Sequence, residues 1–302
     1  MELIVWDGEA RFGLPSMDLK SLQMMAYIKF SGAPVTIIKS SNPFRSPTGR
    51  LPVFKCADGA FSDFNQVATF LRKQNFSCDY ELSPKQCSEV VAYEQLLLEK
   101  WVEPKSYYDV IHKWYFSSMP FPHKLWYPRK YHQGYCDLIN SMFDDPDDNQ
   151  LVETELHKQA QECLTMLSNR LGDREYFFGR SPSTLDAVIF SYLALLLKVD
   201  LKVPVLQNHI KACPNLSRYV SKTIQRFFPS EAHRSTDSRD SPPKDDVPNK
   251  GRNLLLSGLV AFSAMFGYAI AAGLVQVDMG EPPTDDYDYE YDDYNDGESG
   301  GS

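Results

Sequence analysis

The sequence lacks the residue spacings that bind metals or form disulfide frameworks. Its six cysteines and six histidines are scattered, with no Cys-x-x-Cys pair and no histidine spacing typical of a metal site. In a chain of 302 residues, this distribution favours reduced, buried thiols in a cytosolic fold. We therefore expect no metal, no cofactor and no disulfide framework.

The sequence also lacks the features of an N-terminal targeting segment. Its first apolar run, residues 3–6, is far too short for a signal peptide. Glu2, Asp7 and Glu9 do not suit a basic presequence. We expect neither kind of segment here.

Basic residues are absent from the other end of the chain. Residues 278–302 hold ten acidic residues and neither Lys nor Arg, whereas the rest of the chain carries a net charge of +1. The overall charge of −9 is therefore local. The remaining chain has no basic excess suited to nucleic acid, so we expect no nucleic-acid partner.

Charge of either sign is missing from residues 254–277. This run is 24 residues long. As a helix it would reach roughly 36 Å, enough for a hydrocarbon core of about 30 Å. Polar, proline-containing sequence flanks the run, which disfavours the alternative of a buried core helix. The run predicts a transmembrane anchor in the lipid bilayer, with an apolar surface that includes Leu254, Leu259, Phe266, Ile270, Leu274 and Val277.

The flanks of this run predict its orientation. Lys250 and Arg252 precede it, and acidic residues alone carry charge after it. Because basic residues stay on the cytosolic side, the large N-terminal part should be cytosolic and the acidic tail, 278–302, should lie across the membrane. Residues 230–253, rich in Ser, Asp, Pro, Lys and Arg, are expected to form a disordered linker.

Residues 1–76 alternate between strand and helix patterns. Strands are expected at 3–6, 35–38, 51–54 and around Phe61, and helices at 18–31 and 64–74. Gly32 should end the first helix, and Asp58-Gly59 is a hairpin signal. The predicted order is βαβββα or close to it.

Residues 77–229 have almost purely helical patterns, with helices expected at 90–101, 107–116, 151–171 and 185–197. The segment 185–197 carries one charge, Asp186, and is too short to cross a bilayer, so it should be a buried central helix. Ser183 and Asp186 have the spacing of a capping box at its start.

A small α/β domain followed by an all-helical domain resembles the glutathione transferase fold. In that fold a proline, usually cis, precedes the third strand, and Pro52 stands there. Asp58-Gly59 lies at the following hairpin, and Gly179-x-x-Pro182-Ser183-x-x-Asp186 resembles the start of the central helix. The resemblance implies a two-domain α+β/all-α fold, thioredoxin-like over 1–76 and all-helical over 77–229.

Several local motifs give a closer resemblance to the metaxin family. They are residues 13–16 (GLPS), 41–43 (SNP), 79–83 (DYELS), 113–115 (KWY) with 119–122 (MPFP), 177–187 (FFGRSPSTLDA) and 190–194 (FSYLA). The predicted anchor points to the membrane-anchored, metaxin-1-like branch.

The resemblance to metaxins implies a non-enzymatic role at the mitochondrial outer membrane. Metaxins are receptor-like subunits of the sorting and assembly machinery that inserts β-barrel proteins there. The implied partners are another metaxin, the barrel-forming core subunit, the cristae-organising complex and mitochondrial precursor proteins. The implied topology places the body in the cytosol and the acidic tail in the intermembrane space.

The rival interpretation is a membrane-tethered glutathione transferase. The resemblance to transferases implies that such an enzyme holds the thiolate with a Ser, Tyr or Cys near the end of the first strand. It implies that an acidic or Gln residue and a Ser, at the start of the helix after the hairpin, hold the γ-glutamyl end. Ser16 is the only hydroxyl residue of the first loop, and we expect it to be a helix N-cap. Phe64 stands where the second Ser is needed. We therefore expect no catalytic residue and no enzymatic activity.

One loop, residues 119–128 (MPFPHKLWYP), combines prolines with aromatic residues. Rigid aromatic segments are enriched at protein interfaces. Our hypothesis is that Phe121, Trp126 and Tyr127 contact a partner subunit or a client protein. The alternative is a loop that packs on its own domain.

Overall fold

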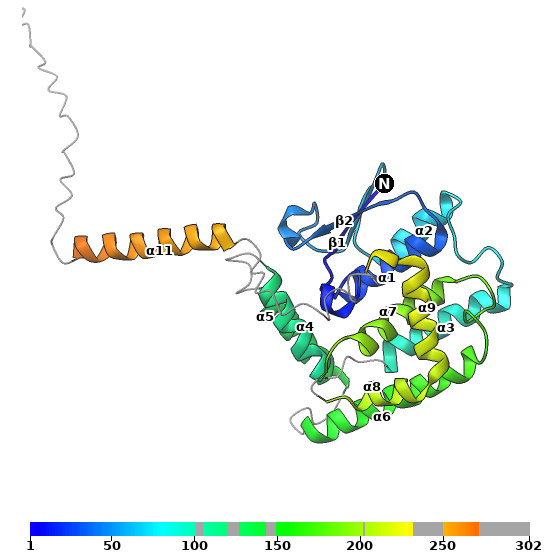
Figure 1. Cartoon of the computed structure of the whole chain (residues 1–302). Helices are drawn as coiled ribbons and strands as arrows, with labels where there is room; N and C mark the ends of the chain where they lie inside the picture. The colour runs from blue at the N-terminus through cyan, green and yellow to red at the C-terminus, as the bar shows by residue number, and fades with distance from the viewer. Residues whose placement is uncertain (101–104, 120–126, 143–148, 202, 232–249, 272–302) are drawn as a thin grey trace, which may run out of the picture. The chain divides into compact units, whose positions relative to one another are not determined.

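The computed structural model describes residues 1–100, 105–119, 127–142, 149–201, 203–231 and 250–271 (Figure 1). It divides into two compact units, Met1–Lys244 and Asp245–Ser302. The first unit holds a small sheet and most of the helices, and the second holds helix α11. The predicted boundary between residues 76 and 77 stays a prediction.

A four-stranded mixed sheet opens the first unit. Its strands are β1 (Glu2–Trp6), β2 (Thr36–Ser40), β3 (Val53–Cys56) and β4 (Gly59–Phe61), in the order β2-β1-β3-β4. Strand β1 runs parallel to β2 and antiparallel to β3, and β3 pairs with β4 as a hairpin. The four strands lie within about two residues of their predicted positions, and the Leu51–Pro52 peptide bond before β3 is cis, as the resemblance implies.

Two α-helices alternate with the strands in this part of the sequence, α1 (Leu19–Ser31) and α2 (Phe64–Lys73). Two short 3-10 helices, η1 (Ala10–Phe12) and η2 (Pro43–Arg45), lie in the loops. Helix α1 ends at Gly32, whose φ of 66° is in the left-handed region that favours glycine. Both α helices begin and end within a few residues of their predicted bounds.

The remaining helices of the first unit follow in sequence. They are α3 (Pro84–Lys100), α4 (Lys105–Ser118), α5 (Tyr127–Met142), α6 (Asn149–Leu171), α7 (Thr184–Lys198), α8 (Val205–Ala212) and α9 (Pro214–Phe227). The sequence predicts α3, α4, α6 and α7, but not α5, α8 or α9. A start signal for α9 was available, because Pro214 occupies its first turn, where proline is favoured.

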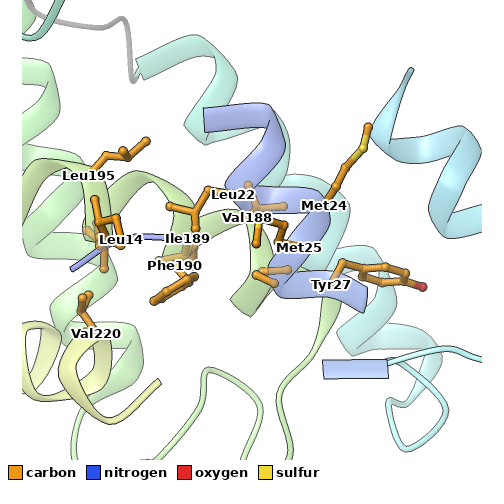
Figure 2. Packing of buried hydrophobic residues seen from close by; sticks show 14 of the residues in the cluster. Leu14, Leu22, Met24, Met25, Tyr27, Val188, Ile189, Phe190, Leu195 and Val220 are labelled. Atoms are coloured by element: carbon orange, nitrogen blue, oxygen red, sulfur yellow. The ribbon is translucent and has the colours of Figure 1, made fainter. Parts of the chain in front are cut away.

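Helix α7 is the buried centre of the helical part, as predicted, and it contacts both α1 and α8 (Figure 1). Figure 2 shows how α1 and α7 meet, with apolar side chains from both helices in one cluster: Leu22, Met25, Val188, Ile189 and Phe190. The capping box is also confirmed, since Asp186 accepts hydrogen bonds from the Ser183 backbone N–H at 2.8 Å and hydroxyl at 2.6 Å. Burial raises the pKa of Asp186 to about 6.

Helix α11 (Lys250–Ala271) is the described part of the second unit. Within the residues that the structure describes, no helix combines the length and the apolar character needed to cross a membrane. The predicted transmembrane anchor over 254–277 is therefore not supported. The helix starts with polar residues at Lys250, inside the predicted linker, and ends at Ala271.

The predicted anchor residues are distributed over and beyond this helix. Leu259 and Phe266 are exposed on α11. Leu254, Ile270, Lys250 and Arg252 belong to α11 as well. Leu274 and Val277 lie outside the described residues, as do most of the predicted linker and the whole acidic tail.

The cysteines depart in part from the prediction. All six lie within the described residues, and none of them forms a disulfide. Cys163 is buried in α6, but Cys87 is exposed on α3 and the other four are half-buried. The prediction of six buried thiols is therefore wrong, because several of these cysteines lie near element ends rather than on core faces.

Candidate functional site

The loop between β1 and α1 is the position at which the transferase interpretation requires a reactive hydroxyl or thiol. Ser16 is fully buried there, and its Oγ accepts a hydrogen bond from the backbone N–H of Asp18 at 3.1 Å. The prediction that Ser16 caps the helix is wrong. Asp18 directly precedes α1 and is the cap, with its carboxylate accepting from the Ser21 N–H at 2.8 Å.

Asp18 also links the first loop to the helical part. Its Oδ1 accepts a hydrogen bond of 2.6 Å from the hydroxyl of Tyr115 on α4, and its Oδ2 accepts one of 2.7 Å from the hydroxyl of Ser21. Burial raises the pKa of Asp18, although the hydrogen bonds from Tyr115 and Ser21 oppose this shift. The Asp18 carboxylate is therefore held by hydrogen bonds from two helices, α1 and α4.

Aromatic rings pack together around Trp6, and they include Tyr115, which donates to Asp18. The Trp6 ring lies 5.1 Å from Tyr115, 5.9 Å from Trp114 and 5.8 Å from Tyr127, each in an edge-to-face arrangement. Gly8 adds to the closure of the loop, since a Cβ there would clash with the backbone carbonyl oxygen of Leu14. The position that would present a reactive group in an enzyme is thus filled by packed aromatic side chains and a tightly closed loop.

The predicted interface loop is described in part. Tyr127, at the start of α5, packs on Trp6 and Tyr115, and burial raises its pKa. Phe121 and Trp126 lie outside the described residues. The proposed partner contact of this loop stays a prediction.

The second half of a glutathione site would lie at the start of α2. Asp63 caps this helix by accepting from the Gln66 N–H at 3.1 Å, and Phe64 is its first residue. The Phe64 ring packs edge-to-face on Tyr27 at 5.5 Å. Ser62 lies one residue before the cap and shares a 3.2 Å hydrogen bond with Thr48. The predicted replacement of a hydroxyl residue by Phe64 thus places an apolar ring at the helix start.

A cavity of about 470 Å³ lies beside α2, the segment that leads into α3, and the start of α7. Its polar lining includes Arg72, Asp79, Glu94 and Thr184. Asp79 accepts hydrogen bonds from the Thr184 backbone N–H at 2.8 Å and hydroxyl at 2.6 Å, and it forms a 3.6 Å ion pair with Arg72. Asp79 thus joins the loop before α3 to the first residue of α7.

Glu94 is the unsatisfied group of this cavity. Its Oε1 is buried and has no hydrogen-bond partner among the described residues. Burial, together with the negative charge of nearby Asp79, raises the pKa of Glu94 to about 7, although the positive charge of Arg72 opposes the shift. A side chain with these properties, placed in a cavity, is a candidate for ligand binding.

Sequence reasoning missed this cavity, although one signal pointed to it. Glu94 lies four residues after Val90 and three before Leu97, so it shares a helix face with two buried apolar residues. A carboxylate on the core face of a helix indicates a polar cavity or a binding partner within the core. The cavity itself depends on α2 and α7, which no local pattern in α3 reveals.

Comparison with known proteins identifies the family. The chain is 38% identical to Metaxin-1 of Macaca fascicularis over 297 residues, which covers 93% of each protein. It is also 38% identical to Metaxin-1 of Bos taurus over 292 residues, which covers 92% of each. Residues 21–132 match the family described as Tom37, outer mitochondrial membrane transport complex protein, and residues 160–223 match the glutathione S-transferase C-terminal domain.

The fold has relatives among solved structures. A glutathione S-transferase of Ceriporiopsis subvermispora, solved in complex with glutathione, superposes with a TM-score of 0.52 at 16% identity. The superposition covers 74% of this chain and 97% of that one. At this identity the likeness concerns the fold alone, which is transferase-like. The similarity to metaxins extends over nearly the whole sequence, and the chain therefore belongs to the metaxin family.

Proposed function

We propose that this protein is a non-enzymatic subunit of the protein import and β-barrel sorting machinery of the mitochondrial outer membrane. Its similarity to Metaxin-1 proteins over nearly the full length is the observation that carries the proposal. The match of residues 21–132 to an outer mitochondrial membrane transport complex protein supports the same role. The folded body acts from the cytosolic face by binding other proteins.

The chemistry of the first loop supports binding rather than catalysis. A transferase must stabilise a thiolate, which requires an accessible donor close to the sulfur. Here Ser16 is buried, and its hydroxyl oxygen accepts from a backbone N–H. The neighbouring Asp18 carboxylate would disfavour a second negative charge at this position. This arrangement opposes thiolate formation.

The proposed partners are another metaxin, the barrel-forming core subunit, the cristae-organising complex and the precursor proteins that enter the organelle. Crosslinking the protein in intact mitochondria, followed by identification of the attached proteins, tests this assignment. Recovery of these subunits and reduced β-barrel assembly after depletion of the protein are expected. Normal β-barrel assembly in depleted mitochondria would contradict the proposal.

A second experiment addresses the rival transferase function. Titration calorimetry of the purified protein with glutathione is expected to show no binding in the micromolar range. Conjugation of glutathione to 1-chloro-2,4-dinitrobenzene is expected to proceed at the uncatalysed rate. Micromolar binding together with catalysed conjugation would establish an enzyme instead.

A further inference from the structure

The cavity beside α2 and α3 combines an unsatisfied acid with an accessible rim. Glu94 is half-buried, and its Oε1 is buried without a hydrogen-bond partner among the described residues. Leaving a buried acceptor without a partner costs free energy in the unliganded protein. A ligand that donates a hydrogen bond to this oxygen would remove the cost. A cationic donor would stabilise the carboxylate more than a neutral donor, because charge-assisted hydrogen bonds are stronger.

The other charged residues of the cavity are already engaged. Asp79 holds the two donors of Thr184, and the Arg72 guanidinium is ion-paired with Asp79 rather than with Glu94. The lining therefore holds two carboxylates and one guanidinium, with one carboxylate unpaired. The electrostatic complement of this lining is a single positive charge.

The apolar part of the lining fits a long aliphatic stem. Val90 and Val91 of α3 and Ala68 of α2 line the cavity next to the charged groups. Lys and Arg side chains bury their methylene stems on such surfaces while the charged end meets a polar partner. Tyr80, which is 62% exposed at the cavity, adds an aromatic ring that attracts cations.

The surface around the cavity indicates a protein segment rather than a small free amine. Val91 is 57% exposed, and Leu98, seven residues further along the same face of α3, is 64% exposed. A small amine would fill the cavity and leave these side chains in water. A peptide that inserts one basic side chain would cover Val91 and Leu98 with its neighbouring residues.

We propose that this cavity binds the side chain of a Lys or Arg residue presented by another protein, with Glu94 as the anionic partner. The inference goes beyond the import role, because it rests on the contacts and charges of the cavity alone. The occupant is a short segment with one basic residue flanked by apolar residues.

Binding assays on the full-length purified protein test the proposal. The probe is the peptide acetyl-Ala-Leu-Lys-Leu-Ala-amide, and the matched probe replaces its Lys by norleucine, which keeps the stem and removes the charge. At pH 8 the Lys peptide is expected to bind at least about fivefold more tightly, the net effect of roughly one ordinary hydrogen bond. n-Butylamine, which carries the charge without flanking residues, is expected to bind more weakly than the Lys peptide.

Three variants locate the site. Glu94→Gln keeps the shape of the side chain and removes its charge, and it is expected to weaken the Lys peptide by about fivefold to tenfold. Thr69→Trp fills the cavity from α2 and should weaken both peptides. Glu81→Gln changes an exposed acid outside the cavity and is the matched control, with binding unchanged.

The pH dependence supplies a further readout. The charged groups that face Glu94 in the described lining are Arg72 from α2 and Asp79 from the loop before α3. Because the pKa of Glu94 is about 7 and loss of its charge weakens binding about fivefold to tenfold, affinity for the Lys peptide should rise about threefold to fivefold between pH 6 and pH 8 in the native protein, and not in Glu94→Gln. Equal affinities for the two peptides, for the native protein and Glu94→Gln, or for n-butylamine and the Lys peptide would overturn the proposal.

Discussion

At the scale of single residues, the hydrogen bond between Tyr115 and Asp18 is the contact with the clearest energetic consequence. Tyr115→Phe removes the 2.6 Å donor and leaves the carboxylate under the aromatic cluster with one partner fewer. The free energy of unfolding is expected to fall by about 2 kcal/mol, because a desolvated acceptor becomes unsatisfied. Urea unfolding of the full chain measures it.

Tyr80→Phe is the control for this substitution. The Tyr80 hydroxyl makes a long 3.5 Å hydrogen bond to the Arg72 carbonyl and is exposed to solvent. Its removal should change stability by less than about 0.5 kcal/mol. Equal effects of the two substitutions would show that the Asp18 contact has no special energetic role.

Glu94 predicts an unusual pH dependence. Its pKa is about 7 in the folded protein against 4.5 for an unperturbed Glu side chain, so between these pH values the folded state holds a proton that the unfolded state has released. The contribution of Glu94 to stability is therefore present below about pH 4.5 and is lost as the pH rises through 7. Glu94→Gln should be more stable than the native protein at pH 8, by on the order of 1 kcal/mol after allowance for solvent screening.

Thermal unfolding of both proteins at pH 5 and pH 8 checks this expectation. The difference between them should be largest at pH 8 and should shrink towards pH 5. Glu81→Gln should follow the native protein at both pH values. A native protein that is more stable than Glu94→Gln at pH 8 would show that the carboxylate has a partner in the folded chain.

At the scale of elements, the same capping motif occurs in a buried and in an exposed setting. Ser183 and Asp186 begin α7 inside the core, while Ser83 and Gln86 begin α3 at the surface. Ser183→Ala should cost about 2 kcal/mol, because it removes a cap and one donor to a buried carboxylate. Ser83→Ala should cost about 0.5 kcal/mol, because water replaces the lost contact.

Chemical denaturation of the two variants under one condition gives the comparison. Asn215→Ala, whose side chain hydrogen-bonds Ser168 between α9 and α6, serves as a reference for a half-buried polar contact. If Ser183→Ala costs no more than Ser83→Ala, burial of the capping box adds nothing to the stability of α7.

Local patterns predicted the elements whose signals are contained within a few residues. The capping box, Gly32 and the proline before β3 are such signals, and the structure has all three where the sequence places them. The expectation that Ser16 is the cap failed because the helix expected over 18–31 begins one residue too early. Asp18 lies just before the helix and caps it through a local contact with Ser21.

Helices that lack a long apolar stripe were missed for a related reason. Helix α8 (Val205–Ala212) is short, with buried Leu206 and Ile210 one turn apart, so its periodicity is hardly visible.

The candidate site was missed because the cavity around Glu94 forms only where α2 and the start of α7 pack against α3. The sequence thus contains the residues of the cavity, while tertiary packing creates its environment.

At the scale of the whole molecule, the first unit has one continuous core. Buried apolar residues extend from Leu3 in β1 to Phe228 after α9, and α1 contacts both β1 and α7. The sheet region and the helical region should therefore unfold together rather than as independent domains.

Hydrogen exchange measured by mass spectrometry tests this cooperativity. Amides of β1 and of α7 are expected to open with the same free energy and with the same dependence on urea. A lower opening free energy for β1 would show that residues 1–76 unfold as a separate domain.

The contact between α1 and α7 also has a consequence for biosynthesis. Leu22 and Met25 leave the ribosome long before Val188 and Ile189 are translated. The apolar face of α1 therefore stays exposed to solvent until its partner helix has been synthesised. Asp79 likewise lacks its hydrogen-bond donor Thr184 until 105 further residues have been added. We therefore expect the apolar face of α1 to stay exposed on the nascent chain until α7 has emerged, which makes this intermediate prone to aggregation.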